Sequence, residues 1–305
     1  MKRTISVMGL LLAGLSVSVA AEQSASKPGV LLLAHGGAAQ WNERVTAVAS
    51  EVDGLQPTEV AFGMASRASI QRAVDKLAAR GVTEIVAVPL FVSSHSSVIT
   101  STEYLLGLRK EAPKDMAIFA KMNHSSHGAP AAEDHSAHGA PAPDPASPVN
   151  LTVPIRMTPA LNRHPLIGAI VVDRAKSVST APANEAVILV AHGPVPDDDN
   201  RRWLEDMAVL AGHIQESASY ASVEYMTVRD DAGPARREAA TKELRDKVQT
   251  QLARGRRVLV VPHLMSFGGI EPGIRKRLEG LAYTMTSQAL MPDDRIVKWV
   301  VQSAR

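Results

Sequence analysis

Three histidines lie just beyond the ends of apolar runs, where they could bind a metal ion or accept a proton. His35 and His192 each follow a continuous apolar run, and each stands inside an Ala-His-Gly tripeptide. His95 comes shortly after a third apolar run, which ends at Leu90. Neutral imidazole binds first-row transition metals and accepts protons near neutral pH. These residue types at these positions predict a reaction that combines metal handling with proton transfer.

The elements that must position these histidines form two similar units. Each unit opens with an apolar run typical of a parallel strand that is buried on both faces. A second strand, an amphipathic helix ending at Arg-Gly, and a third strand follow in both units. The expected strands cover 29–34, 60–62 and 84–90 in the first unit and 186–191, 223–225 and 257–263 in the second. This series predicts parallel sheets with right-handed crossovers.

The duplication predicts an α/β protein of two Rossmann-like domains, each a parallel sheet flanked by helices. We expect the first domain to cover residues 28–178 and the second to cover residues 185–305. The apolar stretch 168–172 is expected to add a strand to the first domain. The stretch 295–301 is expected to be the last strand of the second domain.

His35 and His95 are the strongest candidates for a functional site. Ligands of open parallel sheets bind at the carboxyl ends of the strands, and the first and third strands of such a sheet can be neighbours. We therefore expect the two histidines to face one cleft, as metal ligands and as catalytic proton acceptors. The second unit offers four weaker metal-ligand candidates: His192, His263, Glu224 and Glu271.

A segment at about 120–148 differs in composition from the rest of the chain. It is rich in Ala, Pro, Ser and His and has few large apolar side chains, so it is expected to be a disordered insertion in the first domain. A small repeat inside it contributes four histidines: His124, His127, His135 and His138. Such a tract could bind divalent metal weakly and raise its local concentration. The alternative is a plain linker in which the histidines are incidental.

The N-terminus has the features of a secretory signal peptide. Lys2 and Arg3 precede an uncharged apolar run, and small residues at 18–20 form a cleavage site. We expect residues 1–20 to be removed and the mature chain to be periplasmic or otherwise extracytoplasmic. The apolar run is too short for a comfortable membrane span, and no other stretch is long and apolar enough to form one.

The composition excludes several classes of function. The formal net charge of the 305 residues is only +2, which gives no strong field for nucleic acid. The chain has no cysteine, so disulfides, thiolate ligands and cysteine nucleophiles are impossible. A G-x-S-x-G elbow, which an α/β-hydrolase requires, does not occur. A histidine phosphatase would have Arg before the strand-end histidine, where this chain has Ala34 and Ala191.

Two segments of the first unit resemble a known family. Leu32–Gly36 and Val88–His95 are similar to the corresponding motifs of the CbiX/SirB-type class II chelatases of cobalamin and sirohaem synthesis, and residues 163–167 look like that family's segment before its last strand. The resemblance implies two chelatase-like domains that face a cleft, with His35 and His95 at the positions of the two family histidines. It implies insertion of a divalent metal into a sirohydrochlorin-like tetrapyrrole. Co²⁺ is the expected ion, Ni²⁺, Fe²⁺ or Zn²⁺ are alternatives, and no organic cofactor is expected.

The sequence also departs from the family pattern. Met64 stands where family members often carry Glu, and residues 96–100 lack the acidic residue that often follows the second histidine. In the second unit, Gly268 occupies the place that corresponds to His95. Two functions therefore remain open: a chelatase, or a non-catalytic exported protein that binds or delivers metal or tetrapyrrole. The sequence does not predict an oligomeric state.

Overall fold

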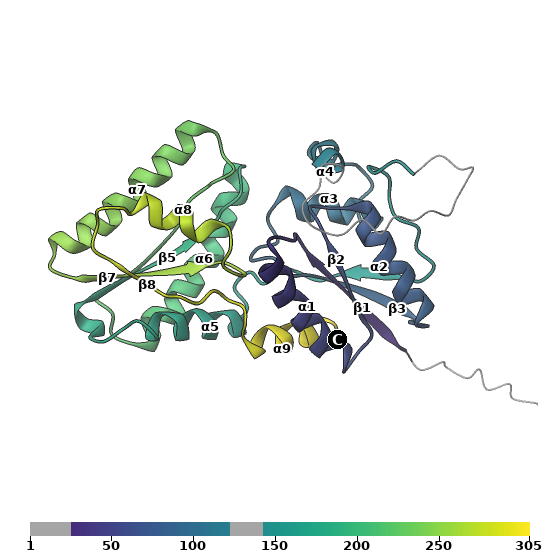
Figure 1. Cartoon of the computed structure of the whole chain (residues 1–305), viewed down its shortest axis with the longest axis horizontal. Coiled ribbons are helices and arrows are strands. Elements are labelled where there is room, and N and C mark those ends of the chain that lie inside the picture. Colours follow the sequence, from purple (N-terminus) through teal and green to yellow (C-terminus); the bar gives the residue numbers. More distant parts are fainter. Residues whose placement is uncertain (1–25, 123–142) are drawn as a thin grey trace, which may run out of the picture.

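The computed structural model describes residues 26–122 and 143–305, which form two lobes that lie side by side (Figure 1). Each lobe is built on a four-stranded sheet, with strand order β2-β1-β3-β4 in the first and β6-β5-β7-β8 in the second. All the strand pairings are parallel. The predicted α/β class with two domains is confirmed.

The element bounds follow the predicted duplication closely. The first sheet consists of β1 (Pro28–Ala34), β2 (Thr58–Phe62), β3 (Glu84–Pro89) and β4 (Ile155–Met157), and the second of β5 (Glu185–Ala191), β6 (Ser222–Thr227), β7 (Arg257–His263) and β8 (Thr284–Met285). The helices are α1 (Ala39–Asp53), α2 (Arg67–Ala79), α3 (Ser97–Leu105), α4 (Met116–Met122), α5 (Pro165–Lys176), α6 (Asp197–Ser217), α7 (Pro234–Ala253), α8 (Ile270–Arg277) and α9 (Asp294–Ser303), with a short 3-10 turn at Pro182–Asn184. Within the described ranges, every helix is too short or too polar to span a membrane.

The strands that precede the candidate histidines occupy the middle of each sheet. β1 lies between β2 and β3, and β5 lies between β6 and β7. Both central strands are almost completely buried, because helices cover both faces of each sheet. The expected adjacency of the first and third strands is confirmed, since Leu33 pairs with Pro89 in the β1–β3 ladder. The loops after β1 and β3 therefore leave the same edge of the sheet.

Two expected strands are helices. Residues 168–172 lie in α5, which begins at the N-cap His164, whose Nδ1 accepts a hydrogen bond from the Leu166 amide at 3.2 Å. Residues 295–301 lie in α9, which Asp293 caps by accepting a hydrogen bond from the Arg295 amide at 3.1 Å. Both stretches are rich in β-branched residues, which favour strands. Their buried positions instead recur at helical spacing, and the fourth strands of the sheets are the short β4 and β8.

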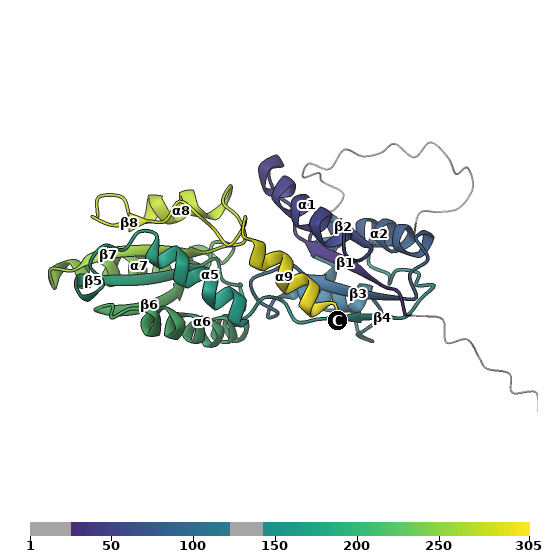
Figure 2. The same ribbon diagram turned by 90° about the horizontal axis from the view of Figure 1, so that it is seen from below.

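Helices α5 and α9 each pack on the lobe opposite to the one expected from their place in the sequence. α5 follows β4 of the first sheet but lies against α6 and β7 of the second lobe, and the C-terminal α9 returns to lie beside α1 (Figure 2). The predicted domain boundaries, 28–178 and 185–305, describe the repeated units of the sequence and stay a prediction. In space, each lobe is completed by a helix from beyond its own sheet.

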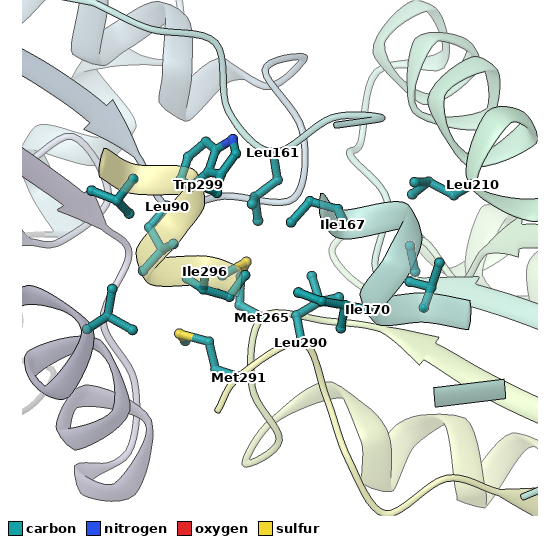
Figure 3. Close-up of a cluster of buried hydrophobic side chains, with 14 of the residues drawn as sticks. Leu90, Leu161, Ile167, Ile170, Leu210, Met265, Leu290, Met291, Ile296 and Trp299 are labelled. Carbon is teal, nitrogen blue, oxygen red and sulfur yellow. The ribbon is translucent and has the colours of Figure 1, made fainter. Parts of the chain in front are cut away.

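The two crossing helices share one apolar core with both sheets. The cluster contains residues of α5, α6, α9 and the segments before them, and Figure 3 labels Leu90, Leu161, Ile167, Ile170, Leu210, Met265, Leu290, Met291, Ile296 and Trp299. All ten are buried. The buried guanidinium of Arg174 links α5 to the segment before α9. It donates to the Ala289 carbonyl at 2.8 Å and pairs with Asp293 at 3.0 Å. The lobes are therefore joined by continuous packing in addition to the chain connections.

The glycines of the two Ala-His-Gly tripeptides give a matched test of this geometry. Gly36 and Gly193 both adopt φ of +79°, a left-handed conformation that disfavours other residues. A Cβ on Gly36 would lie 3.8 Å from its nearest neighbours, whereas one on Gly193 would lie 2.4 Å from Cβ of Thr227. We expect Gly36→Ala to lower the free energy of unfolding by about 1–2 kcal/mol. Gly193→Ala should cost about 1–3 kcal/mol more because of overpacking. Urea unfolding of both variants measures the difference, and equal losses would contradict the close contact at Thr227.

Candidate functional site

His35 emerges from the carboxyl end of β1 with its two ring nitrogens in different environments. Its Nδ1 makes a short contact with the Gly36 carbonyl oxygen, which can only accept a hydrogen bond. The proton of the neutral ring is therefore placed on Nδ1, and Nε2 is left as the lone-pair nitrogen. The ring packs against Trp41, with centroids 4.4 Å apart, and more loosely against Phe91 at 6.1 Å. This arrangement presents Nε2 as a metal ligand or proton acceptor.

The surroundings of His35 favour its neutral form. Although part of the residue is exposed, desolvation by the packed side chains behind the ring is the largest cause that lowers its pKa below the usual value. The contact with Gly36 and the charge of Asp231 act in the opposite direction, and the charge of His192 lowers the pKa further. A neutral imidazole is the form that binds metal and accepts a proton.

His192 occupies the equivalent position in the second lobe, at the carboxyl end of β5. Its Nε2 lies 3.3 Å from Oδ2 of Asp231, in a geometry that does not form a good hydrogen bond. Both residues influence the charge on His35. The carboxyl-end loops of the two sheets therefore face each other, and Arg44 of α1 donates to Ser266 beyond β7 at 2.5 Å across the same boundary.

His95 lies in the loop between β3 and α3, which backbone and side-chain contacts hold in place. The Ser94 amide donates to Asn162 Oδ1 at 2.7 Å, and Asn162 donates back to Ser94 Oγ at 3.0 Å. The His95 amide donates to Ser93 Oγ at 3.1 Å. From the second lobe, the indole of Trp203 donates to the His95 carbonyl oxygen at 2.7 Å. The position of His95 thus depends on both lobes.

Asp206 is a candidate site residue that the sequence analysis missed. It lies on α6, close to one turn beyond Trp203, and its charge interacts with His95. Its side chain is 14% exposed, and Oδ2 has no hydrogen-bond partner. Burial raises the pKa of Asp206 above its usual value, while His95 and Arg163 lower it. The available signal was an acidic residue on the apolar face of the helix, between the buried Trp203 and Leu210.

The structure places His35 and His95 in adjacent loops but gives them different partners. Phe91, in the loop that carries His95, is the residue that approaches the His35 ring. Electrostatically, His35 is coupled to His192 and Asp231, whereas His95 is coupled to Asp206. Across residues 26–122 and 143–305, no group of three or more His, Cys, Asp or Glu side chains is arranged to hold a metal. The predicted joint role of the two histidines stays a prediction.

Two of the weaker candidates make contacts that occupy their carboxylates elsewhere. Glu224, on β6, pairs with Lys247 at 3.1 Å and accepts from Gln251 at 2.5 Å, so α7 holds it. Glu271 accepts from the amides of Gly268 and Gly269 and closes the turn into α8. Both contact sets are structural. His124, His127, His135 and His138, like the expected signal peptide, lie outside the described residues.

The second lobe places a cation where the first has a methionine. Met64 lies two residues beyond Phe62, the β2 residue that pairs with Ala34. Arg229 lies two residues beyond Thr227, the β6 residue that pairs with Ala191. The Arg229 guanidinium pairs with Asp197 at 2.7 Å and donates to the Pro194 carbonyl at 3.1 Å, and its amide donates to the His192 carbonyl at 2.7 Å. This positive charge braces the loop after β5 and disfavours a bound cation beside it.

The last weaker candidate, His263, predicts a pH dependence of stability. It ends β7, is 2% exposed, and its Nδ1 has no partner; burial lowers its pKa to about 4. The unfolded chain binds this proton with a pKa of about 6.5. The stability linked to neutral His263 is therefore fully present above about pH 6.5 and is lost as the pH falls toward 4. Between about pH 7 and about pH 5, the loss should be roughly 2 kcal/mol.

Unfolding in urea at both pH values checks this expectation. His263→Gln cannot take up the proton, so its free energy of unfolding should fall less than that of the wild type over the same interval. An unchanged pH dependence in the variant would show that other groups are responsible.

The fold and the site define a two-lobed α/β protein with strand-end histidines at the facing edges of its two parallel sheets. The family model of CbiX matches residues 29–178, and through this segment the chain belongs to the CbiX family of class II chelatases. The segment contains β1, β3, His35 and His95. A search of curated protein sequences finds no significant match.

Solved structures with the same fold include chelatases. SirB from Bacillus subtilis with Fe³⁺ shares 16% identity at a TM-score of 0.57, covering 92% of this chain and 94% of SirB. Sirohydrochlorin chelatase SirB from Bacillus subtilis subspecies spizizenii, in complex with cobalt, shares 14% identity, with the same TM-score and the same coverage of both chains. A multi-domain protein of Deinococcus radiodurans with structural similarity to chelatases shares 16% identity at a TM-score of 0.50, over 92% of this chain and 55% of that protein. At these identities the similarity shows a shared fold.

Proposed function

We propose that the mature chain inserts a divalent metal ion, with Co²⁺ as the leading candidate, into a sirohydrochlorin-like tetrapyrrole outside the cytoplasm. The observation that carries this proposal is the position of His35 and His95 inside the CbiX-family segment, at the carboxyl ends of the neighbouring strands β1 and β3. The similar SirB structures hold Fe³⁺ or cobalt, which supports a first-row metal as substrate. The signal peptide predicted from residues 1–20 supports this location.

The proposed mechanism assigns both metal binding and proton transfer to the histidines. Nε2 of His35, left without a proton by the contact of Nδ1 with Gly36, binds the incoming ion. His95 holds the ion from the loop after β3. Insertion of a dication into the neutral macrocycle releases two pyrrole protons, and the imidazoles accept them as the ring nitrogens take over the metal.

The small number of protein ligands suits a metal that must leave the protein. A resident metal site usually has three or four protein ligands, whereas the described residues form no group of three or more. Two imidazoles would bind the ion loosely enough to transfer it to the four nitrogens of the macrocycle. The same sparse ligand set is the feature that also permits a delivery protein.

A turnover assay with Co²⁺ and sirohydrochlorin tests the proposal. The spectrum of the tetrapyrrole changes on metal insertion, so the rate is read directly against the reaction without protein. In one arm of the assay, the protein carries alanine at the four tract histidines. This change separates the contribution of His35 and His95 from metal binding by the tract. Rate enhancement that survives this change and disappears in His35→Ala supports the proposal.

The alternative is an exported protein that binds or delivers metal or tetrapyrrole without catalysis. It is favoured by Met64 at a position where the family resemblance suggests an acid, and by Arg229 at the equivalent place in the second lobe. Tight binding of metal and macrocycle with no rate above the uncatalysed reaction would establish this function and overturn the proposed one.

A further inference from the structure

Helix α6 of the second lobe reaches the His95 loop of the first lobe through two side chains. Trp203 donates its indole N–H to the His95 carbonyl oxygen at 2.7 Å. Asp206 follows three residues later and therefore lies on the same face of the helix. The Trp203 contact fixes α6 against the loop, so the carboxylate is held in the neighbourhood of the His95 ring, whose charge acts on it.

The carboxylate of Asp206 is not satisfied by the protein around it. Oδ2 is inaccessible to solvent and has no hydrogen-bond partner. Oδ1 lies 3.8 Å from Nε of Arg163, a long separation to a side chain that is 61% exposed. Burying a carboxylate without strong partners lowers the stability of the fold, and a well-packed apolar residue at the same position would avoid this loss. Its presence on the apolar face of α6 calls for a role other than stability.

We propose that Asp206 is a positioning residue for His95, supplying from the opposite lobe the negative charge that orients this imidazole and strengthens it as a metal ligand. This inference rests on the proposed function, because it deepens the role of the same site. Carboxylates commonly support metal-bound histidines in this way, through the ring nitrogen that does not bind the metal. The dication that arrives at His95 would in turn stabilise the ionised carboxylate.

In this arrangement, the ability of His95 to bind metal depends on both lobes. The ligand comes from the loop after β3, whereas the supporting charge comes from α6. Separation of the lobes would remove Asp206 and Trp203 from His95 together. Metal would therefore be held most firmly when the lobes are together.

Calorimetric titration with Co²⁺ tests the inference. The titrations use full-length mature protein in which the four tract histidines are replaced by alanine. Asp206→Asn keeps the side-chain volume but removes the charge, and should weaken Co²⁺ binding about 10- to 100-fold. Asp206→Glu should recover part of the affinity. The matched control is Glu216→Gln, which removes an exposed carboxylate in the last turn of the same helix, and its Co²⁺ affinity should stay within about twofold of the wild type.

Thermal unfolding separates positioning from packing. A neutral amide costs less to bury than a carboxylate, so Asp206→Asn should be as stable as the wild type or more stable. Affinity lost together with stability, with no recovery in Asp206→Glu, would assign a packing role and overturn the inference.

His95→Ala distinguishes failure of the inference from failure of the proposed function. If this variant loses the Co²⁺ site but Asp206→Asn binds like the wild type, the site stands and the role of Asp206 is wrong. If His95→Ala binds Co²⁺ like the wild type, both the proposed site and the inference are overturned.

Discussion

His95→Ala is expected to reduce the rate of metal insertion by about a hundredfold to ten-thousandfold, the usual range for loss of a positioned proton acceptor. The fold should be unaffected, because the contacts that hold this loop use the backbone of residue 95. The amide donates to Ser93 and the carbonyl accepts from Trp203, and alanine retains both groups. Stopped-flow absorbance with Co²⁺ and sirohydrochlorin measures the rate, and circular dichroism checks the fold.

His192→Ala is the matched control for this prediction. His192 lies at the equivalent strand end but next to Asp231 and the loop braced by Arg229, and the second lobe has Gly268 where the first has His95. We expect its effect to be several-fold smaller than that of His95→Ala. Equal losses in the two variants would show that both lobes contribute ligands, and wild-type turnover in His95→Ala would remove this residue from the mechanism.

Trp299→Ala is expected to lower the free energy of unfolding by about 3–5 kcal/mol. The side chain is 1% exposed and lies in the cluster where α9 meets the first lobe and the crossing segments (Figure 3). Its removal leaves a cavity that rigid strands and helices on several sides cannot fill. Since a typical domain is stable by about 5–15 kcal/mol, this loss is a large share of the total.

Guanidinium-chloride unfolding measures this loss, with Lys298→Ala as the control. Lys298 is exposed on the same helix, so its replacement should change stability by less than about 0.5 kcal/mol. The prediction also tests the placement of α9 on the first lobe. A Trp299→Ala variant as stable as the control would mean that α9 does not pack into the shared core.

The central strands were predictable because their signal is local. β1, β3, β5 and β7 are continuous apolar runs, as expected for strands covered by helices on both faces. The runs at 168–172 and 295–301 were misread because β-branched content outweighed helical spacing in short windows. β4 and β8 were missed because they are three and two residues long. Strands so short carry no periodicity of their own.

Within the candidate site, the sequence by itself determined the residues at the strand ends. An apolar run followed by His-Gly places His35 and His192 at the carboxyl ends of the central strands, since the run must be buried and the glycine takes a positive φ. Only the tertiary structure decided that α5 and α9 cross between the lobes and that the charges of His192 and Asp231 act on His35. It also decided that α6, which carries Asp206, contacts the His95 loop through Trp203. Those relations depend on which surfaces of distant segments pack together, and no spacing within one segment encodes them.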